Sequence, residues 1–241
     1  MKKQFSSKYP LIHQIVLSDD SLLYKPNENS LKVKSQFGAD NYVLWNLTST
    51  RDFISDNYPP HVTAAFDSLL PYAYKCDLAR FCILNHFGGI YADVSVGKIR
   101  PINVGEKEMV IFRDLNSDRT SWKVATSFFY SVPKNPILLD AIEQIVANVN
   151  NNYYGYDPHF PTGPSVFGLA VAKFGLQVDL LIGQYWWFKN RRNKFVLSNN
   201  IVIARHKRGG SRMGGNSGIL GGNNYNELWA NRRVYGKGQS A

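Results

Sequence analysis

The sequence predicts an α/β fold with a mixed, mostly parallel sheet and helices on its faces. Short apolar runs alternate with segments of helical periodicity, and this β-α-β order is typical of parallel sheets. The 241 residues suit one domain with a sizeable core. We expect a single domain over 1–241, with a core at about 10–210 and a basic segment rich in glycine and asparagine at about 205–241.

Elements in the first part of the chain follow from apolar runs and from proline and glycine positions. An apolar run between Pro10 and a polar SDDS segment predicts a buried first strand. Prolines 59 and 60 should end a helix that Ser49 or Thr50 caps. The elements expected here are a strand at 11–17, a helix near 31–37, a strand at 41–46, and helices to residue 54 and at about 62–69.

The second part of the chain repeats the alternation of strands and helices. The elements expected here are strands at 109–113, 124–131, 178–182 and 194–204, and helices at 136–148 and 164–174. A loop at 150–161, rich in asparagine, tyrosine and proline, would lie near an acceptor site if it covers the pocket. The aromatic residues 185–188 are either core, a sugar-stacking wall or a lipid-facing surface.

The stretch 73–96 carries most of the candidate functional residues. Its first part has helical periodicity, and Asp77 and Arg80 stand three apart, so they share a face and can act together. Two glycines at 88 and 89 can end the helix and turn directly into a strand at 90–96. Alternation places Tyr91, Asp93 and Ser95 on one face or edge of that strand. A structural ion pair at Asp77–Arg80 and a structural hydrogen bond at Asp93 remain the plain alternatives.

The charge balance favours an anionic partner. Lys and Arg number 28 against 18 Asp and Glu, a formal net charge of +10. Nucleic acid, phospholipid headgroups and a diphosphate-bearing substrate all fit such a balance. Since no helix-turn-helix, zinc finger or basic-aromatic motif accompanies the charge, we expect no nucleic-acid partner.

The cysteines and the hydropathy of the sequence indicate in which cellular compartment the protein is expected. Cys76 and Cys82 fall on different faces of one predicted helix, so we do not expect a disulfide between them. Two unpaired cysteines indicate a reducing compartment. No apolar run approaches the roughly 20 residues of a bilayer-spanning helix, and the N-terminus does not have the pattern of a secretory signal. We expect a cytoplasmic protein, with peripheral contact at the cytoplasmic membrane as one option.

The motif residues resemble a known family. Cys76-Asp77, Arg80, Leu84, Gly88-Gly89, Tyr91 and Asp93 match the pattern S-D-x-x-R-x-x-x-L-x-x-x-G-G-x-Y-x-D-x-D, with Cys76 in place of its Ser. This pattern is similar to that of glycosyltransferase family 32, the sugar-binding region containing the DXD motif. Ser95 departs from it, because it stands where the family has the second Asp. The resemblance implies a GT-A type fold in which Asp77, Arg80, Gly89 and Tyr91 serve the nucleotide sugar.

Weaker matches extend the resemblance to both ends of the chain. Residues 12–15 read IHQI, as the family's first strand does, which implies that His13 and Gln14 line the donor pocket. His13 is equally well explained as a hydrogen-bonded histidine in the core or at the sheet edge. His206 falls where family members have a His after the last strand, and the resemblance implies a contact with the diphosphate or the metal. Residues 162–164 match a family T-G-P, which is equally well explained as a helix start.

The resemblance implies a retaining transferase that uses a nucleoside-diphosphate hexose. A divalent cation, Mn or Mg, would neutralise the leaving diphosphate, held by Asp93 with Ser95 and His206 as further ligands. A hydroxyl at position 95 is a weaker ligand, which predicts looser metal binding or a metal-independent enzyme. The expected acceptor is a glycan or a lipid-linked acceptor in surface polysaccharide or glycolipid synthesis. The alternative is a catalytically weak relative that binds a nucleotide sugar or a glycan.

Overall fold

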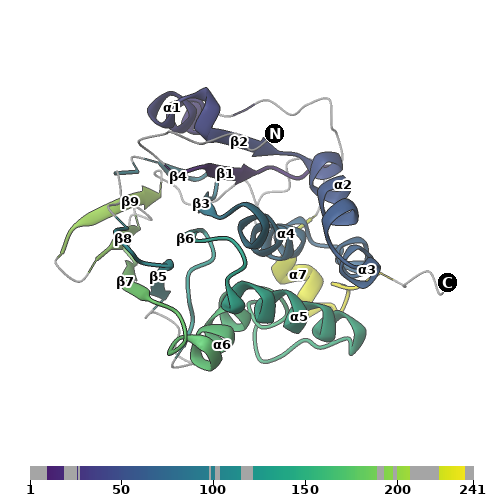
Figure 1. Ribbon diagram of the computed structural model, residues 1–241. Helices are drawn as coiled ribbons and strands as arrows, with labels where there is room; N and C mark the ends of the chain where they lie inside the picture. Colours follow the sequence, from purple (N-terminus) through teal and green to yellow (C-terminus); the bar gives the residue numbers. More distant parts are fainter. Residues whose placement is uncertain are drawn as a thin grey trace.

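Among the residues that the structure describes, a nine-stranded sheet forms the centre of the molecule (Figure 1). The computed structural model describes residues 10–18, 26, 28–97, 99–100, 104–114, 122–188, 193–197, 200–206 and 223–236. The strands, in the order in which they lie in the sheet, are β2 (Tyr42–Trp45), β1 (Ile12–Ile15), β3 (Gly89–Ala92), β6 (Phe128–Ser131), β5 (Met109–Asp114), β7 (Leu180–Trp186), β8 (Lys194–Val196), β9 (Val202–His206) and β4 (Val96–Gly97).

The sheet is mixed, as expected. Strand β1 is parallel to β2 and β3, and β5 is parallel to β7. The remaining pairs, β3–β6, β5–β6, β7–β8, β8–β9 and β4–β9, are antiparallel, so parallel pairing is less extensive than the sequence suggested. The parallel strands β1 and β3 bring their carboxyl ends to the same edge of the sheet, which is where α/β sheets bind ligands.

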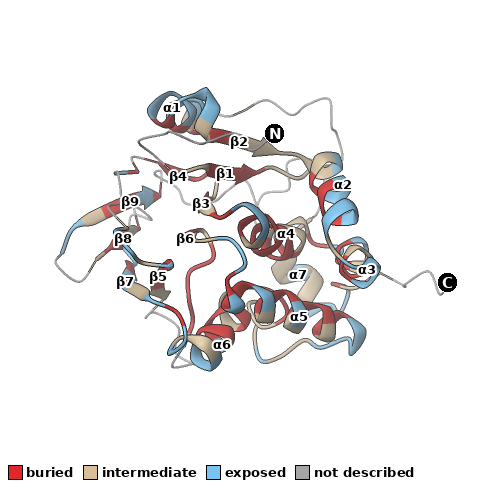
Figure 2. Ribbon diagram, viewed as in Figure 1, coloured by how far each residue is buried: buried red, intermediate tan, exposed pale blue. Residues whose placement is uncertain are grey.

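Helices flank the sheet, the arrangement expected of the GT-A type. They are α1 (Glu28–Phe37), α2 (Leu47–Asn57), α3 (Pro60–Ser68), α4 (Tyr72–Phe87), α5 (Pro136–Asn150), α6 (Pro164–Phe174) and α7 (Tyr225–Ala230), with a short 3-10 helix, η2, at Ala39–Asn41. In Figure 1, α1 lies beside β2, while α2 to α5 and α7 gather on the other side of the molecule. Figure 2 shows α4 as the most completely buried of these helices, because it lies between the sheet and its neighbours.

Two apolar cores occupy the two faces of the sheet. The larger joins α2 to α6 with side chains of the sheet such as Ile111 and Phe129. The smaller joins α1, through Val33 and Phe37, to the opposite face at residues such as Ile90. Burial of both faces accounts for the mainly apolar strands predicted from the sequence.

The turn from α4 into β3 requires glycine at both positions. Gly88 has φ +66° and Gly89 has φ +100°, in the region that L side chains rarely adopt. A Cβ at Gly89 would also collide with the Leu11 carbonyl, and one at Gly88 would lie 2.7 Å from Pro133. The chain can therefore pass at once from a buried helix into a central strand.

Four predicted strands have different limits in the structure, and the one expected at 124–131 begins only at Phe128. The strand expected at 90–96 ends at Ala92, because Asp93 to Ser95 form a turn closed by a Val96 N–H to Asp93 carbonyl hydrogen bond of 2.8 Å. The strand expected at 194–204 is a hairpin of β8 and β9, since Asn200 adopts φ +63° and Leu197 donates to Ile201 at 3.0 Å. The strand expected at 178–182 begins later and runs on to Trp186.

The aromatic cluster at 185–188 is divided between core and surface. Tyr185 is buried, whereas Trp186, Trp187 and Phe188 are exposed. Helix α7, near the end of the chain, was not predicted from the sequence. The basic glycine-rich residues 207–222 lie outside the described part of the chain. Within the described residues, no helix has the length and apolar character needed to cross a bilayer.

Candidate active site

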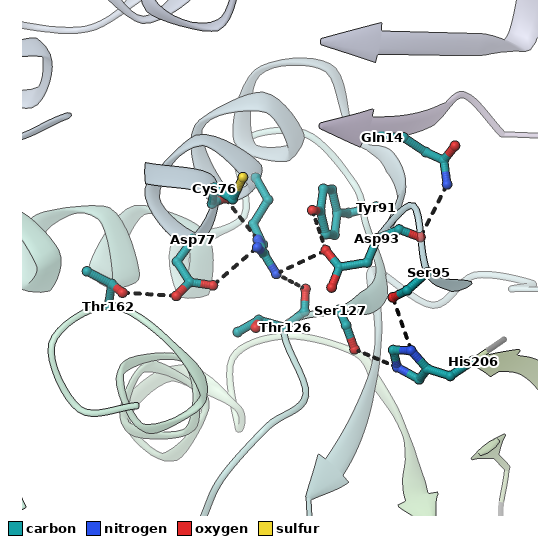
Figure 3. Close-up of polar contacts among 11 residues, drawn as sticks. Gln14, Cys76, Asp77, Tyr91, Asp93, Ser95, Thr126, Ser127, Thr162 and His206 are labelled. Atoms are coloured by element: carbon teal, nitrogen blue, oxygen red, sulfur yellow. Dashed lines mark hydrogen bonds and ion pairs between the residues drawn. The ribbon is translucent and has the colours of Figure 1, made fainter. Parts of the chain in front are cut away.

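A cavity of about 260 Å³ opens at the carboxyl ends of β1 and β3. Ile15 to Leu17 of β1 and its extension line one part of it, and the turn at Asp93 to Ser95 lines another. Asp77 and Arg80 of α4 and His206 of β9 belong to the polar lining (Figure 3). The structure therefore brings together five of the residues predicted for the site, Asp77, Arg80, Asp93, Ser95 and His206.

Asp77 and Arg80 form an ion pair on one face of α4. Arg80 Nη2 lies 3.3 Å from Asp77 Oδ1, and Thr162 Oγ1 donates to Asp77 Oδ2 at 2.9 Å. Burial raises the pKa of Asp77, while Arg80 and the Thr162 hydrogen bond oppose that rise. A buried carboxylate with these two partners can accept a further hydrogen bond from a sugar hydroxyl.

Arg80 is bound by protein groups on several sides. Its Nε donates to the Cys76 carbonyl at 2.9 Å and its Nη1 to the Thr126 carbonyl at 2.7 Å. Its guanidinium carbon lies 4.5 Å from the centre of the Tyr91 ring. With 6% of the side chain exposed, Arg80 is placed to orient the two carboxylates more than to reach a ligand itself.

Asp93 is held at the first position of the turn after β3. Its N–H donates to the Ser127 carbonyl at 2.8 Å, and its carbonyl accepts from Gln14 Nε2 at 3.2 Å. The Tyr91 hydroxyl donates to Asp93 Oδ1 at 2.6 Å, and Arg80 Nη1 lies 3.7 Å from the same oxygen. Asp93 Oδ2 has no hydrogen-bond partner among the residues described, so this oxygen is available to a ligand in the cavity.

Pairing of β4 with β9 places Ser95 beside His206. Val96 stands opposite His206 in the antiparallel register, and the Ser95 hydroxyl lies 3.1 Å from His206 Nδ1. His206 Nε2 lies 3.5 Å from the Ser127 hydroxyl. Burial lowers the pKa of His206 to about 4, so its imidazole is neutral near neutral pH.

The donor set fits a divalent cation bound mainly through its substrate. The residues described include no group of three or more His, Cys, Asp or Glu side chains that could hold a metal by themselves. Asp93 Oδ2 and the neutral His206 nevertheless line one cavity, and Mg²⁺ is commonly bound by one or two carboxylates together with substrate phosphates and water. Asp93 and His206 would hold such a cation, with Ser95 as a neutral neighbour.

Four of the predicted donor-binding residues lie behind the cavity lining. His13 is buried between the Gly88 carbonyl, 3.2 Å from its Nε2, and Trp45 Nε1, 3.2 Å from its Nδ1. Gln14 supports the Asp93 carbonyl and accepts from the Tyr42 hydroxyl at 2.8 Å. Gly89 permits the turn and Tyr91 supports Asp93. Their contacts are structural, and a direct role in donor binding stays a prediction.

Several further residues of the cavity lining were not singled out in the sequence analysis. They come from three parts of the chain, among them Tyr74, Pro158, His159 and Tyr225. The loop at 150–161 was expected near an acceptor site, and the structure does place Pro158 and His159 at the cavity. No spacing in the sequence links these positions, because tertiary folding alone makes them neighbours.

Comparison with known proteins supports the motif assignment. Residues 23–118 match a family model described as the glycosyltransferase sugar-binding region containing DXD motif. An uncharacterized glycosyltransferase of Acanthamoeba polyphaga mimivirus is 36% identical over 36% of this chain and 35% of its own length. Inositol phosphoceramide mannosyltransferase 2 of Schizosaccharomyces pombe is 24% identical over 80% of this chain and 53% of its own length.

The aligned region covers only part of each relative. The chain spans between about a third and about half of the length of these two relatives. A solved structure described as PaToxG Glycosyltransferase superposes with a TM-score of 0.45 at 15% identity, covering 68% of this chain and 69% of that one. The motif match and the sequence relatives support a glycosyltransferase family 32-like protein.

Proposed function

We propose that this protein is a retaining glycosyltransferase, which moves a hexose from a nucleoside-diphosphate sugar to a glycan or a lipid-linked acceptor. The observation that carries the proposal is the position of Asp93. It lies directly after a central strand, at the edge where α/β sheets bind ligands, with one carboxylate oxygen available in a cavity. Asp77, Arg80 and His206 meet it there from α4 and β9.

Each polar residue has a task in this reaction. Asp77 accepts hydrogen bonds from the hydroxyls of the transferred sugar, and Arg80 holds Asp77 and Asp93 in place. A divalent cation, when bound, would neutralise the negative charge that develops on the leaving diphosphate. Asp93 and His206 face the diphosphate, and the turn at Asp93 to Ser95 is kept in position by Gln14 and Ser127. In a retaining reaction at one face of the sugar, the leaving phosphate itself can take the acceptor proton.

The relatives indicate which donor to test first. Three proteins of Schizosaccharomyces pombe that match this chain are named inositol phosphoceramide mannosyltransferases. A mannosyl donor and an inositol-phosphate lipid acceptor therefore come first among the hexose donors and lipid-linked acceptors. A role in surface polysaccharide or glycolipid synthesis, with peripheral contact at a membrane surface, agrees with the net charge of +10.

The test is thermal stabilisation by a panel of UDP, GDP, CMP and dTDP sugars, each with Mn²⁺ and with a chelator. A bound donor raises the melting temperature by mass action. We expect one nucleotide class to stabilise the protein, more strongly with Mn²⁺, and the same donor to be consumed in a turnover assay. Absence of stabilisation by every donor, with and without Mn²⁺, would contradict the proposal.

A catalytically weak binding protein is the second candidate, and Ser95 favours it. The turn presents one carboxylate where the family motif has two, and the Ser95 hydroxyl is already engaged with His206. Such a protein would bind the nucleotide sugar in the panel but would not turn it over. Donor turnover therefore separates the two candidates.

A further inference from the structure

The cavity has an aromatic wall that the proposed donor chemistry does not use. Tyr74 of α4, His159 of the loop before α6 and Tyr225 of α7 line it. The ring centre of Tyr225 lies 6.1 Å from that of Tyr74 and 6.3 Å from that of His159. Three rings from distant parts of the sequence are therefore neighbours on one side of the cavity, and we call them the aromatic wall.

His159 is oriented by the partly buried ion pair of Lys123 and Asp157. The backbone N–H of His159 donates to Asp157 Oδ1 at 2.8 Å, and its ring Nδ1 lies 3.3 Å from the same oxygen. Lys123, which is buried, donates to Asp157 Oδ2 at 2.6 Å and fixes that carboxylate. His159 Nε2 has no hydrogen-bond partner within the described part of the chain. The imidazole thus has one nitrogen engaged by the protein and one left for a ligand.

The two tyrosines of the wall are also held in place. The Tyr74 hydroxyl donates to the Pro158 carbonyl at 2.7 Å, which ties α4 to the His159 loop. Trp229 Nε1 donates to the Tyr154 carbonyl at 2.8 Å, which ties α7, and with it Tyr225, to the start of the same loop. A wall arranged in advance loses little conformational freedom when it binds a ligand.

The wall lies next to the position proposed for the transferred sugar. Thr162, three residues after His159, donates to Asp77 at 2.9 Å. A Cβ built on Gly163 would stand 3.1 Å from Asp77 Oδ2, so the backbone of the loop passes close to that carboxylate. A molecule on the wall would therefore contact the sugar bound at Asp77.

The side chains of the wall suit a saturated ring that carries hydroxyl groups. Aromatic faces pack against the C–H groups of such a ring, and an imidazole nitrogen exchanges a hydrogen bond with a hydroxyl. A small number of polar groups on a mainly apolar wall is typical of sites that orient a small molecule. Ile15 to Leu17, at the carboxyl end of β1, line the same cavity, and we assign the nucleobase to these residues.

We propose that His159 and Tyr225, backed by the buried ring of Tyr74, form the acceptor subsite of this protein, and that the subsite takes a cyclic polyol, either a hexopyranoside or a cyclitol. The term acceptor rests on the proposed function. Binding of a cyclic polyol at the wall does not depend on turnover, and it can be measured whether or not a donor has been identified.

The test is ligand-observed saturation-transfer NMR on the full chain, with methyl α-D-mannopyranoside, methyl β-D-galactopyranoside and myo-inositol as separate probes. We expect at least one probe to bind, and the identity of that probe distinguishes a hexopyranoside from a cyclitol. His159→Ala and Tyr225→Leu should weaken its binding about five- to tenfold, the size expected for one aromatic contact. Tyr225→Phe keeps the ring and should retain binding.

Tyr156→Ala is the matched control, because Tyr156 lies in the same loop, is 75% exposed and does not line the cavity. This variant should bind the probe as the original protein does. Nucleotide stabilisation, measured in parallel, should survive His159→Ala and Tyr225→Leu. The proposal is overturned if no probe binds, if both variants bind as before, or if they lose nucleotide stabilisation instead, since the wall would then hold the base. Failure of the nucleotide panel with intact probe binding would overturn only the proposed function.

Discussion

The two sides of the cavity are built in opposite ways. The motif side, lined by Asp77, Arg80 and Asp93 with Tyr91 behind them, comes from one short stretch in which a helix turns directly into a strand. The aromatic wall comes from α4, the loop before α6 and α7, which are far apart in the sequence. The motif side is dense in charge and nearly closed to solvent, whereas the wall has rings and one available imidazole nitrogen.

This difference has a physical basis. A buried charged side chain needs an ion-pair or hydrogen-bond partner at a fixed distance. A helix followed by a tight turn places such partners close together within one short stretch of sequence. A surface that recognises one acceptor has no such requirement, and it can be formed by helices and loops from distant parts of the sequence. The motif side should therefore determine whether transfer occurs, and the wall should determine which molecule receives the sugar.

The largest effect should follow from Asp93→Asn, on the motif side. The change removes the carboxylate charge facing the diphosphate but keeps an oxygen that can accept from Tyr91. We expect transfer to fall by about a thousandfold or more, with little change in melting temperature. Initial rates with the donor found in the panel, together with thermal melting, measure both effects.

Asp114→Asn is the control for that change. Asp114 also ends a strand, β5, but it accepts from Trp187 Nε1 at 2.9 Å and does not line the cavity. The activity of the Asp114→Asn variant should stay within about twofold of that of the original protein. Full activity of the Asp93 variant would show that the catalytic site lies elsewhere.

Arg80→Met should mainly affect stability. The variant leaves Asp77 buried without its ion-pair partner, which is expected to lower the free energy of unfolding by about 3–5 kcal/mol. Urea unfolding measures this quantity. The exposed pair of Arg51 with Asp67 provides the comparison, and Arg51→Met should cost less than about 1 kcal/mol. Equal losses of unfolding free energy in the two variants would mean that the buried ion pair stabilises the fold no more than the exposed one.

The pH dependence of stability tests the packing behind the motif side. Burial lowers the pKa of His13 to about 4 from 6.5, so at acid pH the unfolded chain binds a proton that the folded chain does not. Stability should therefore fall as the pH falls through 6.5 toward 4, by about 2 kcal/mol between pH 7.5 and pH 5 from this residue. Urea unfolding at the two pH values, with and without His13→Gln, isolates that contribution.

An exposed histidine serves as the control for this measurement. His61 lies on the surface of α3, and His61→Gln measures how much the pH slope of the unfolding free energy changes when a histidine outside the core is replaced. If His13→Gln changes the slope no more than His61→Gln does, His13 does not stay neutral in the fold.

The smallest effect is expected from Ser95→Asp, which restores the second acid of the family motif. A carboxylate at this place can still accept from His206 Nδ1 and adds a negative charge beside Asp93. We expect Mn²⁺ to bind about tenfold more tightly, measured by titration of donor turnover or of nucleotide stabilisation. Unchanged Mn²⁺ affinity would place residue 95 outside the metal site, and Ser95→Ala should not tighten binding at all.

The sequence by itself determined the class of fold and the motif side of the site. Spacing three apart on a helix is enough to pair Asp77 with Arg80, and a two-glycine turn is enough to carry the chain into the strand before Asp93. These relations depend on local backbone geometry, which is why they can be predicted from neighbouring residues. The same locality explains the correct order of most strands and helices in the first part of the chain.

Only the tertiary structure decided the rest. The strand predicted to carry Ser95 stops at Ala92, since the backbone turns there, and antiparallel pairing of β4 with β9 then sets Ser95 against His206. His13, although it matches the family's first strand, is packed behind the cavity by contacts with Gly88 and Trp45. The aromatic wall exists because long-range packing brings distant segments together, and no periodicity in a sequence records contacts of that kind.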